Sequence, residues 1–143
     1  IGMDVDFYNL LSILRGKFWG LDEQQIQDLI VTHTTSAPKD LLARMISAES
    51  VKDALGELST TIYKDLIPQT DNAIDALSEF ERGFELATYR AINRTFTRMF
   101  SFATVIGVLK LTTYEIRNIA AIAFAVEQQI PVQTVMSKLV IAE

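Results

Sequence analysis

Three arginines at four-residue spacing form the pattern in this chain that best fits a binding role. Arg90, Arg94 and Arg98 stand at positions i, i+4 and i+8 of one predicted helix. Because an α-helix has 3.6 residues per turn, each arginine is displaced by only about 40° from the one before it, so the three guanidinium groups line one side. Such a stripe can dock an acidic partner or the carbonyl groups at a helix end. It can also be a solvated face that is paired with carboxylates of a neighbouring helix, and the sequence leaves both readings open.

The residue types of the chain give little support for a catalytic function. The single histidine, His33, lies in a polar loop between threonines, with no second histidine to complete a metal pair or an acid–base pair. The chain contains neither a phosphate-binding glycine motif nor a serine-nucleophile motif. We therefore predict no catalytic, metal-binding or cofactor-binding residues. Neighbouring carboxylates, which we expect on solvated faces and at helix starts, are Asp22 with Glu23 and Glu79 with Glu81 and Glu85.

Composition suits one globular domain, or one repeat unit with part of another. The chain has 143 residues, of which 49% are hydrophobic, enough to bury a sizeable core. Its net charge of −5 argues against nucleic acid as the main partner, because phosphate neutralisation needs a basic face. The absence of cysteine excludes disulfides and thiolate metal sites, which fits a reducing compartment.

The most apolar run of the chain extends from Phe102 to Val126. Lys110, Glu115 and Arg117 interrupt it, and each charge near the centre of a bilayer costs about 2.5–3.5 kcal/mol on insertion scales. We therefore expect this run to be a buried helix rather than a membrane span.

The spacing of apolar residues predicts an all-α fold, an antiparallel helical bundle. Apolar side chains recur every three to four residues, as in the stripe Phe7, Leu10, Leu11, Leu14 and Phe18. No alternating run is bounded by hairpin turns, so no strand is expected. The predicted helices are Asp4–Trp19, Asp22–Val31, Lys39–Ala48, Val51–Leu58, Ile62–Ile67, Asn72–Phe100, Phe102–Val126 and Pro131–Ile141.

A helix, a break and a second helix occur twice, 109 residues apart. The segments Asp6–Val31 and Glu115–Val140 align without a gap and indicate an internal repeat. Since asparagine is a mediocre helix former, an asparagine repeated in mid-helix predicts a buried amide that binds the backbone end of an adjoining helix. The identical pairs are Asn9 with Asn118, Ile13 with Ile122, Gln24 with Gln133 and Val31 with Val140.

These residues resemble a known family. The stretch NLLSILRGKFWGLDEQQIQDLIV, with L-R-G-K at Leu14–Lys17 and G-L-x-x-x-x-I at Gly20–Ile26, resembles the C subunit of archaeal A-type ATP synthases. The related d subunit of eukaryotic V-type ATPases is similar too, best at YEIRNIAAIA, Tyr114–Ala123. STTIYKDLIP at Ser59–Pro68 resembles the region before that family's longest helix. The second copy departs from the pattern, because L-R-G-K becomes A-F-A-V at Ala123–Val126.

The resemblance implies a fold of three similar helical units arranged as a funnel. Since the chain is much shorter than a full family member, we expect it to be the C-terminal part. Residues 1–31 would then be the closing helix pair of a preceding unit. Residues 32–143 would form one complete unit.

The resemblance also implies a non-catalytic role. Family members act as a socket between the central rotor shaft and the membrane proteolipid ring, and couple ATP chemistry to proton or sodium transport. The chain would then be peripheral to the cytoplasmic side of the membrane, with no cofactor and no nucleic-acid partner. We expect Arg90, Arg94 and Arg98 to contribute to a partner surface. The alternative is a stand-alone helical module that binds peptides in a groove between repeats.

Overall fold

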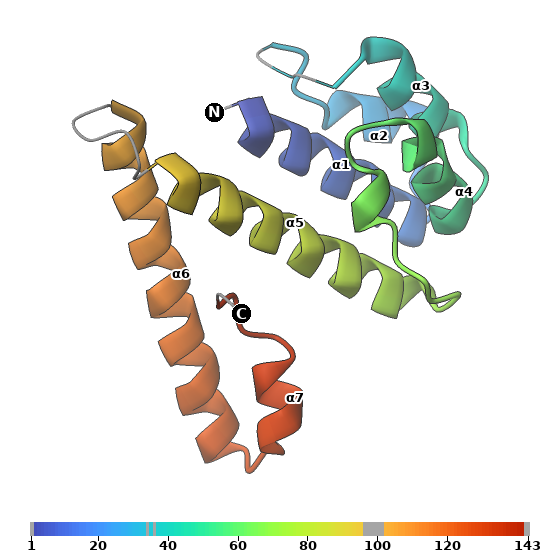
Figure 1. Ribbon diagram of the computed structural model, residues 1–143. Helices are drawn as coiled ribbons and strands as arrows, with labels where there is room; N and C mark the ends of the chain where they lie inside the picture. The colour runs from blue at the N-terminus through green and yellow to red at the C-terminus, as the bar shows by residue number, and fades with distance from the viewer. Residues whose placement is uncertain (1, 34, 36, 96–101, 142–143) are drawn as a thin grey trace. The chain divides into compact units, whose positions relative to one another are not determined.

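The computed structural model describes residues 2–33, 35, 37–95 and 102–141, and these residues form helices and no strand (Figure 1). The predicted all-α fold is therefore confirmed. The elements are α1 (Gly2–Phe18), α2 (Glu23–Asp28), α3 (Lys39–Ser47), α4 (Val51–Gly56), the 3₁₀ turns η1 (Glu57–Thr60) and η2 (Lys64–Leu66), α5 (Ala73–Thr95), α6 (Phe102–Glu127) and α7 (Val132–Met136).

The chain divides into two compact units, residues 1–84 and 85–143, and the division falls inside α5. The predicted segments, 1–31 and 32–143, describe the boundaries between repeat units and not the boundaries of compact units. They stay a prediction. Residues from both of these segments share the core of the first compact unit. The predicted long helix Asn72–Phe100 is observed as far as Thr95, and its remainder lies outside the described residues.

Local capping signals in the sequence set the boundaries of the short helices. Asp22 accepts a hydrogen bond from the Gln25 backbone N–H at 2.8 Å, and the Gln25 side chain accepts one from the Asp22 N–H at 3.0 Å. This reciprocal pair satisfies two backbone donors that the first turn of α2 would otherwise leave unpaired. Ser50 caps α4 in the same way through the Asp53 N–H at 3.1 Å.

Two predicted helices are replaced by tighter turns. The helix predicted over Val51–Leu58 ends at Gly56 and continues as η1, and only η2 forms within Ile62–Ile67. Thr61 explains the change, because its hydroxyl donates to the Leu58 carbonyl at 2.7 Å and accepts the Tyr63 N–H at 3.1 Å. These bonds compete with the backbone bonds that an α-helix would need.

Helix α1 lies in the core of the first unit. Phe80 and Phe84 of α5 are buried against it, and the Phe7 and Phe84 rings stack with centroids 4.8 Å apart. The predicted stripe on α1 is therefore right for most of its length, but wrong for Phe18, which is 41% exposed. Other fully buried side chains of this core are Leu10, Ile13, Leu14, Ile26, Leu41, Met45 and Leu58.

The second unit has a much smaller core. Ile92 of α5, Tyr114 of α6 and Val140 form it, with the Tyr89 ring 6.3 Å from that of Tyr114. The prediction that Phe102–Val126 is a buried helix is wrong, because only Gly107, Tyr114 and Ala125 of α6 are buried. In the part of the chain that the structure describes, no helix combines the length and hydropathy that a bilayer crossing needs.

The α1–α2 corner and the α6–α7 corner have the same local geometry, 109 residues apart. Each turns at a residue in the left-handed region, Gly20 with φ 71° and Gln129 with φ 54°, so that helix-ending carbonyls find donors. The observed register of the two corners thus equals the register of the sequence alignment. The equivalent backbone bonds are Leu21 N–H to the Gly16 carbonyl and Ile130 N–H to the Ala125 carbonyl, each 2.9 Å long.

A close approach of α2 to α1 requires glycine at the first corner. A Cβ added at Gly16 would lie 2.7 Å from Ile26 Cγ1, closer than real Cβ contacts allow. The equivalent positions in the second corner hold Ala125 and Val135. A larger residue on one helix is thus matched by a smaller residue on the other.

We predict that Gly16→Ala destabilises the protein by about 1–3 kcal/mol, because overpacking forces Ile26 or the α2 backbone to move. Adding Ile26→Val should recover part of the loss, since it removes Cδ1, which lies 3.1 Å from the added Cβ, while the γ carbons remain. Urea unfolding followed by circular dichroism measures both effects. Gly56→Ala is the matched control, because an added Cβ there has no neighbour within 4 Å and alanine favours the helix. Equal midpoints for Gly16→Ala and the parent chain would show that the approach is not tight.

Candidate functional site

The predicted arginine stripe lies on α5. Arg90 and Arg94 are both exposed on the last turns of this helix. Arg98 lies outside the described residues. The structure therefore places two of the three predicted residues on exposed helix surface, and their role in partner binding stays a prediction.

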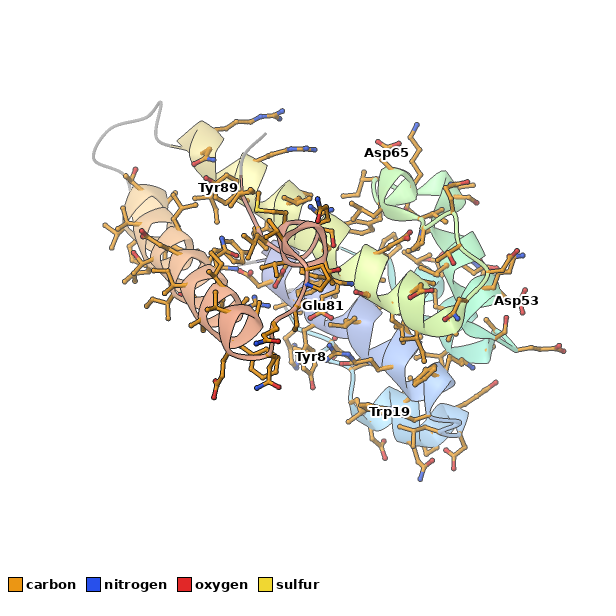
Figure 2. The ribbon with its side chains drawn as sticks, turned by 90° about the horizontal axis from the view of Figure 1, so that it is seen from below. Tyr8, Trp19, Asp53, Asp65, Glu81 and Tyr89 are labelled. Atoms are coloured by element: carbon orange, nitrogen blue, oxygen red, sulfur yellow. The ribbon has the colours of Figure 1, made fainter. Side chains whose placement is uncertain are left out.

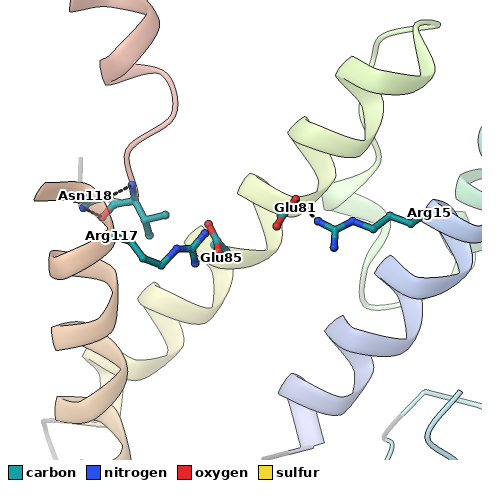
Figure 3. Close-up of polar contacts among 6 residues, drawn as sticks. Arg15, Glu81, Glu85, Arg117 and Asn118 are labelled. Atoms are coloured by element: carbon teal, nitrogen blue, oxygen red, sulfur yellow. Dashed lines mark hydrogen bonds and ion pairs between the residues drawn. The ribbon is translucent and has the colours of Figure 1, made fainter. Parts of the chain in front are cut away.

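Two glutamates of α5, one turn apart, bind arginines of other helices (Figure 3). Glu81 accepts a hydrogen bond from Arg15 of α1 at 3.0 Å, and this partly exposed pair contributes at most about 1 kcal/mol. Glu85 pairs with Arg117 of α6 and is only 8% exposed. The expectation of a solvated face is therefore wrong for Glu85, because α6 supplies a cation against it.

Each repeated asparagine holds the backbone of one valine by two hydrogen bonds. Asn9 Nδ2 donates to the Val31 carbonyl and the Val31 N–H donates to Asn9 Oδ1, both at 2.9 Å. Asn118 makes the same two bonds with Val140, at 2.8 and 3.0 Å (Figure 3). The predicted amide–backbone bonding is therefore confirmed. The Asn118 bonds also explain why α7 ends well before Ile141, since Val140 is held by a side chain rather than by a helix.

We expect Asn9→Ala to destabilise the protein by about 1–3 kcal/mol, because Asn9 is fully buried and its loss leaves both Val31 groups without a partner. Asn118→Ala should cost a comparable amount, since Asn118 is half-buried but the Val140 groups that it would leave belong to a residue that is 5% exposed. Chemical denaturation measures both changes. Gln24→Ala serves as control, because the exposed Gln24 side chain donates to exposed Asp28, and a surface change of this kind shifts stability by about 0.5 kcal/mol at most. A neutral Asn9→Ala would contradict the assigned role.

Asp6 is a buried carboxylate that sequence reasoning did not assign to the core. It is 1% exposed and accepts hydrogen bonds from the Tyr63 hydroxyl at 2.7 Å, the Thr35 hydroxyl at 2.6 Å and the Ala37 N–H at 3.1 Å. Its position was a usable signal, because Asp6, Asn9 and Leu10 share one face of the helix. Burial, with the Asp6 hydrogen bond, raises the pKa of Tyr63 well above its ordinary value. The group ties the loop before α3 and the turn before η2 to α1.

The raised pKa of Tyr63 predicts a loss of stability at alkaline pH. Tyrosine in the unfolded chain ionises near pH 10, whereas folded Tyr63 keeps its proton, so its contribution is complete below about pH 10 and falls above it. Unfolding measured at pH 8 to 11 should show this decline. Tyr63→Phe should flatten the decline and cost about 1–3 kcal/mol at pH 7, because Asp6 loses a donor. The exposed Tyr8→Phe control should keep the slope; an unchanged slope in Tyr63→Phe would contradict this account.

A pocket of about 710 Å³ opens in the first unit. Apolar side chains of Phe18, Leu55 and Pro68 line it, and two lysines stand among them, Lys17 and Lys52. Lys17 donates to the Ile46 carbonyl and Lys52 pairs with exposed Asp71. Lys52 also lies close enough to Asp53 for the two charges to interact. Both lysines thus have acceptors already, and the apolar part of the lining suits an apolar group better than acid–base chemistry. Among the described residues, no group of histidines and carboxylates could hold a metal ion.

Helix α1 and the corner that follows it carry exposed aromatic side chains. Tyr8 is 49% exposed and Trp19 is 68% exposed (Figure 2), as is Phe18 in part. Large aromatic groups left in water are typical of surfaces that bind other proteins. The first unit thus has a pocket and exposed aromatic side chains, and the second unit has the exposed arginines of α5.

The chain belongs to the ATP synthase (C/AC39) subunit family, whose pattern matches residues 1–138. It is 29% identical over 132 residues to the C subunit of the A-type ATP synthase of Pyrococcus abyssi. It is 28% identical over 134 residues to the protein of the same name from Pyrococcus horikoshii. These alignments cover 89% and 90% of this chain but 35% of each relative, so the chain spans about a third of their length. No solved structure matches the chain.

Proposed function

We propose that this chain is part of a non-catalytic central-stalk subunit of a rotary A/V-type ATPase. In this proposal the subunit is a socket that couples the rotor shaft to the membrane proteolipid ring during proton or sodium transport. The observation that carries it is the family match over residues 1–138. The names of the two Pyrococcus relatives support the A-type member of the family. The subunit would be peripheral to the membrane on its cytoplasmic side.

The packing of the chain suits the transmission of torque. A coupling element must keep its shape under load, and close-packed protein interiors are poorly compressible. In the first unit α1 shares its core with other helices, and buried Asn9 and Asp6 hold Val31 and Ala37 of the α2–α3 connection by hydrogen bonds. The 23-residue helix α5 supplies side chains to both cores, among them Phe80 and Ile92. These features support a structural role.

We propose the same repeat organisation that the sequence suggests. Residues 1–31 would close a preceding unit and residues 32–143 would form a complete one, within a larger helical funnel. The equal offset of 109 residues at both corners supports this, since it holds for the backbone bonds as well as for the asparagine bonds.

We further propose that Arg90, Arg94 and Arg98 belong to a surface that binds shaft or ring subunits. Exposed Arg90 and Arg94 support this, because arginine forms strong, directional bonds with carboxylates and with backbone carbonyls.

Changing Arg90, Arg94 and Arg98 to Glu should weaken binding to the other stalk subunits, because attraction to acidic groups becomes repulsion. We expect a loss of about tenfold or more in affinity with an unchanged far-ultraviolet helical signal. Pull-down against separate shaft subunits and proteolipid ring measures it. The matched control changes Lys39, Lys64 and Lys138 to Glu, which alters net charge by the same amount at exposed positions outside the pocket. Equal binding by both triple variants would refute the arginine surface.

The same pull-down tests the function itself when it is done with the parent chain. Binding to the shaft, to the ring or to both is the expected result. Binding to neither, with the helical signal intact, would overturn the proposed role and favour an independent helical interaction module.

A further inference from the structure

The pocket of the first unit combines an apolar floor with a charged wall. Its volume of about 710 Å³ lies within the range of roughly 300–1,000 Å³ that small-molecule sites occupy. We call its buried lining residues the pocket floor: Val51, Leu55 and Ala76. The partly exposed ring of Phe18 lines the pocket as well. A ligand with an apolar body would therefore remove apolar surface from water here.

Lys17 supplies the charge of the pocket wall. Its ammonium group donates to the Ile46 carbonyl in the last turn of α3, and this bond holds the end of the side chain. The carbonyl is neutral, and a lysine ammonium has three N–H donors. Within the described part of the chain, no carboxylate forms an ion pair with Lys17. The wall thus has a positive charge without a counter-charge, and it has further hydrogen-bond donors.

The other lysine of the lining is already neutralised. Lys52 pairs with Asp71, and the nearby Asp53 carboxylate also attracts it. Asp71 lines the pocket too, so this ion pair adds no net charge to the lining. The unbalanced charge is therefore that of Lys17. Such a wall attracts an anionic group and repels a cationic one.

The helix corner itself does not require the residue types at positions 17 and 18. The second corner has the same left-handed turn and the same closing backbone bond. With the offset of 109 residues, it has Val126 in place of Lys17 and Glu127 in place of Phe18. Neither the cation nor the aromatic ring is thus needed to form the turn. Both side chains line the pocket, which gives their types another role.

We propose that this pocket binds an anionic single-chain amphiphile. The apolar chain lies against the pocket floor and the Phe18 ring, and the carboxylate or phosphate head group accepts hydrogen bonds from Lys17. A free fatty acid and a single-chain phospholipid share this chemistry. The inference goes beyond the rotary ATPase role and does not depend on it, because it rests on the pocket and Lys17 alone.

Titration calorimetry of the chain with four probes, each below its micelle concentration, tests the proposal. Decanoate and decyl phosphate carry the two head groups, decylammonium reverses the charge, and acetate lacks the chain. We expect one-to-one binding of at least one of the two anionic amphiphiles, about tenfold or more tighter than that of decylammonium. The tighter anion identifies the fatty-acid or the phosphate head group. Failure of both anions to bind, or equal binding of decylammonium or acetate, would overturn the proposal.

Lys17→Met locates the head group, because it removes the charge and keeps an apolar side chain. We expect it to weaken binding of the tighter anion by about tenfold or more, since a hydrogen bond to a charged group is lost. Lys39→Met is the matched control, because Lys39 is exposed and lies outside the pocket. Equal affinities for the parent chain and a folded Lys17→Met chain would contradict the assignment.

Gly56→Phe locates the apolar chain and decides the result if Lys17→Met does not fold. Gly56 lines the pocket, and a Cβ added there has no neighbour within 4 Å, so a larger side chain can begin there without a clash. Circular dichroism checks the folding of each variant. Because the ring takes space from the ligand, we expect binding to weaken by about tenfold or more. Unchanged binding in folded Gly56→Phe would place the ligand outside the pocket and overturn the proposal.

Discussion

The reciprocal pair of hydrogen bonds between an asparagine side chain and one backbone residue is the interaction on which both helix corners depend. An amide carries a donor and an acceptor side by side, so Asn9 satisfies the N–H and the carbonyl of Val31 together. Val31 lies beyond the end of α2, and fixing it sets the path of the chain toward α3. Asp6, one turn earlier on α1, then holds Ala37 and Tyr63. One face of a single helix thus positions two segments that are distant in sequence, the α2–α3 connection and the turn at Tyr63.

The equivalent helices α1 and α6 have different surroundings in the two units. In the first, α1 is covered by residues 37–84, and its apolar residues are in the core. In the second, α6 contacts few residues and most of its apolar side chains are in water. The spacing of apolar residues predicts which side of a helix is buried. It does not predict which element packs against that side. Helix α6 therefore leaves apolar side chains exposed on a face whose equivalent in α1 lies in a core.

Local chemistry was predictable from the sequence, whereas pairings between distant residues were not. Asp22 and Ser50 cap helices through short-range hydrogen bonds that their residue types favour. The bonding of Asn9 to a backbone end was predicted because asparagine is a mediocre helix former. Glu85 was misjudged because its burial depends on Arg117, 32 residues away. The burial of α6 was misjudged for the same reason, since apolar composition does not say whether a covering element is present. The arginine stripe remains a prediction, with two of its members described.

The Gly16–Ile26 contact has a consequence for how the two corners could have diverged. One corner has glycine against isoleucine and the other has alanine against valine, so a methyl group is gained on one helix as one is lost on the other. The two substitutions are not equivalent as first steps. Enlarging glycine first creates a clash, whereas shortening isoleucine first leaves a small cavity that costs about 0.5–1.5 kcal/mol. Since valine keeps the γ carbons, of which one lies nearest to the added Cβ, shortening isoleucine relieves only part of the clash, and a change from the first type of corner to the second also requires a shift of α2 against α1.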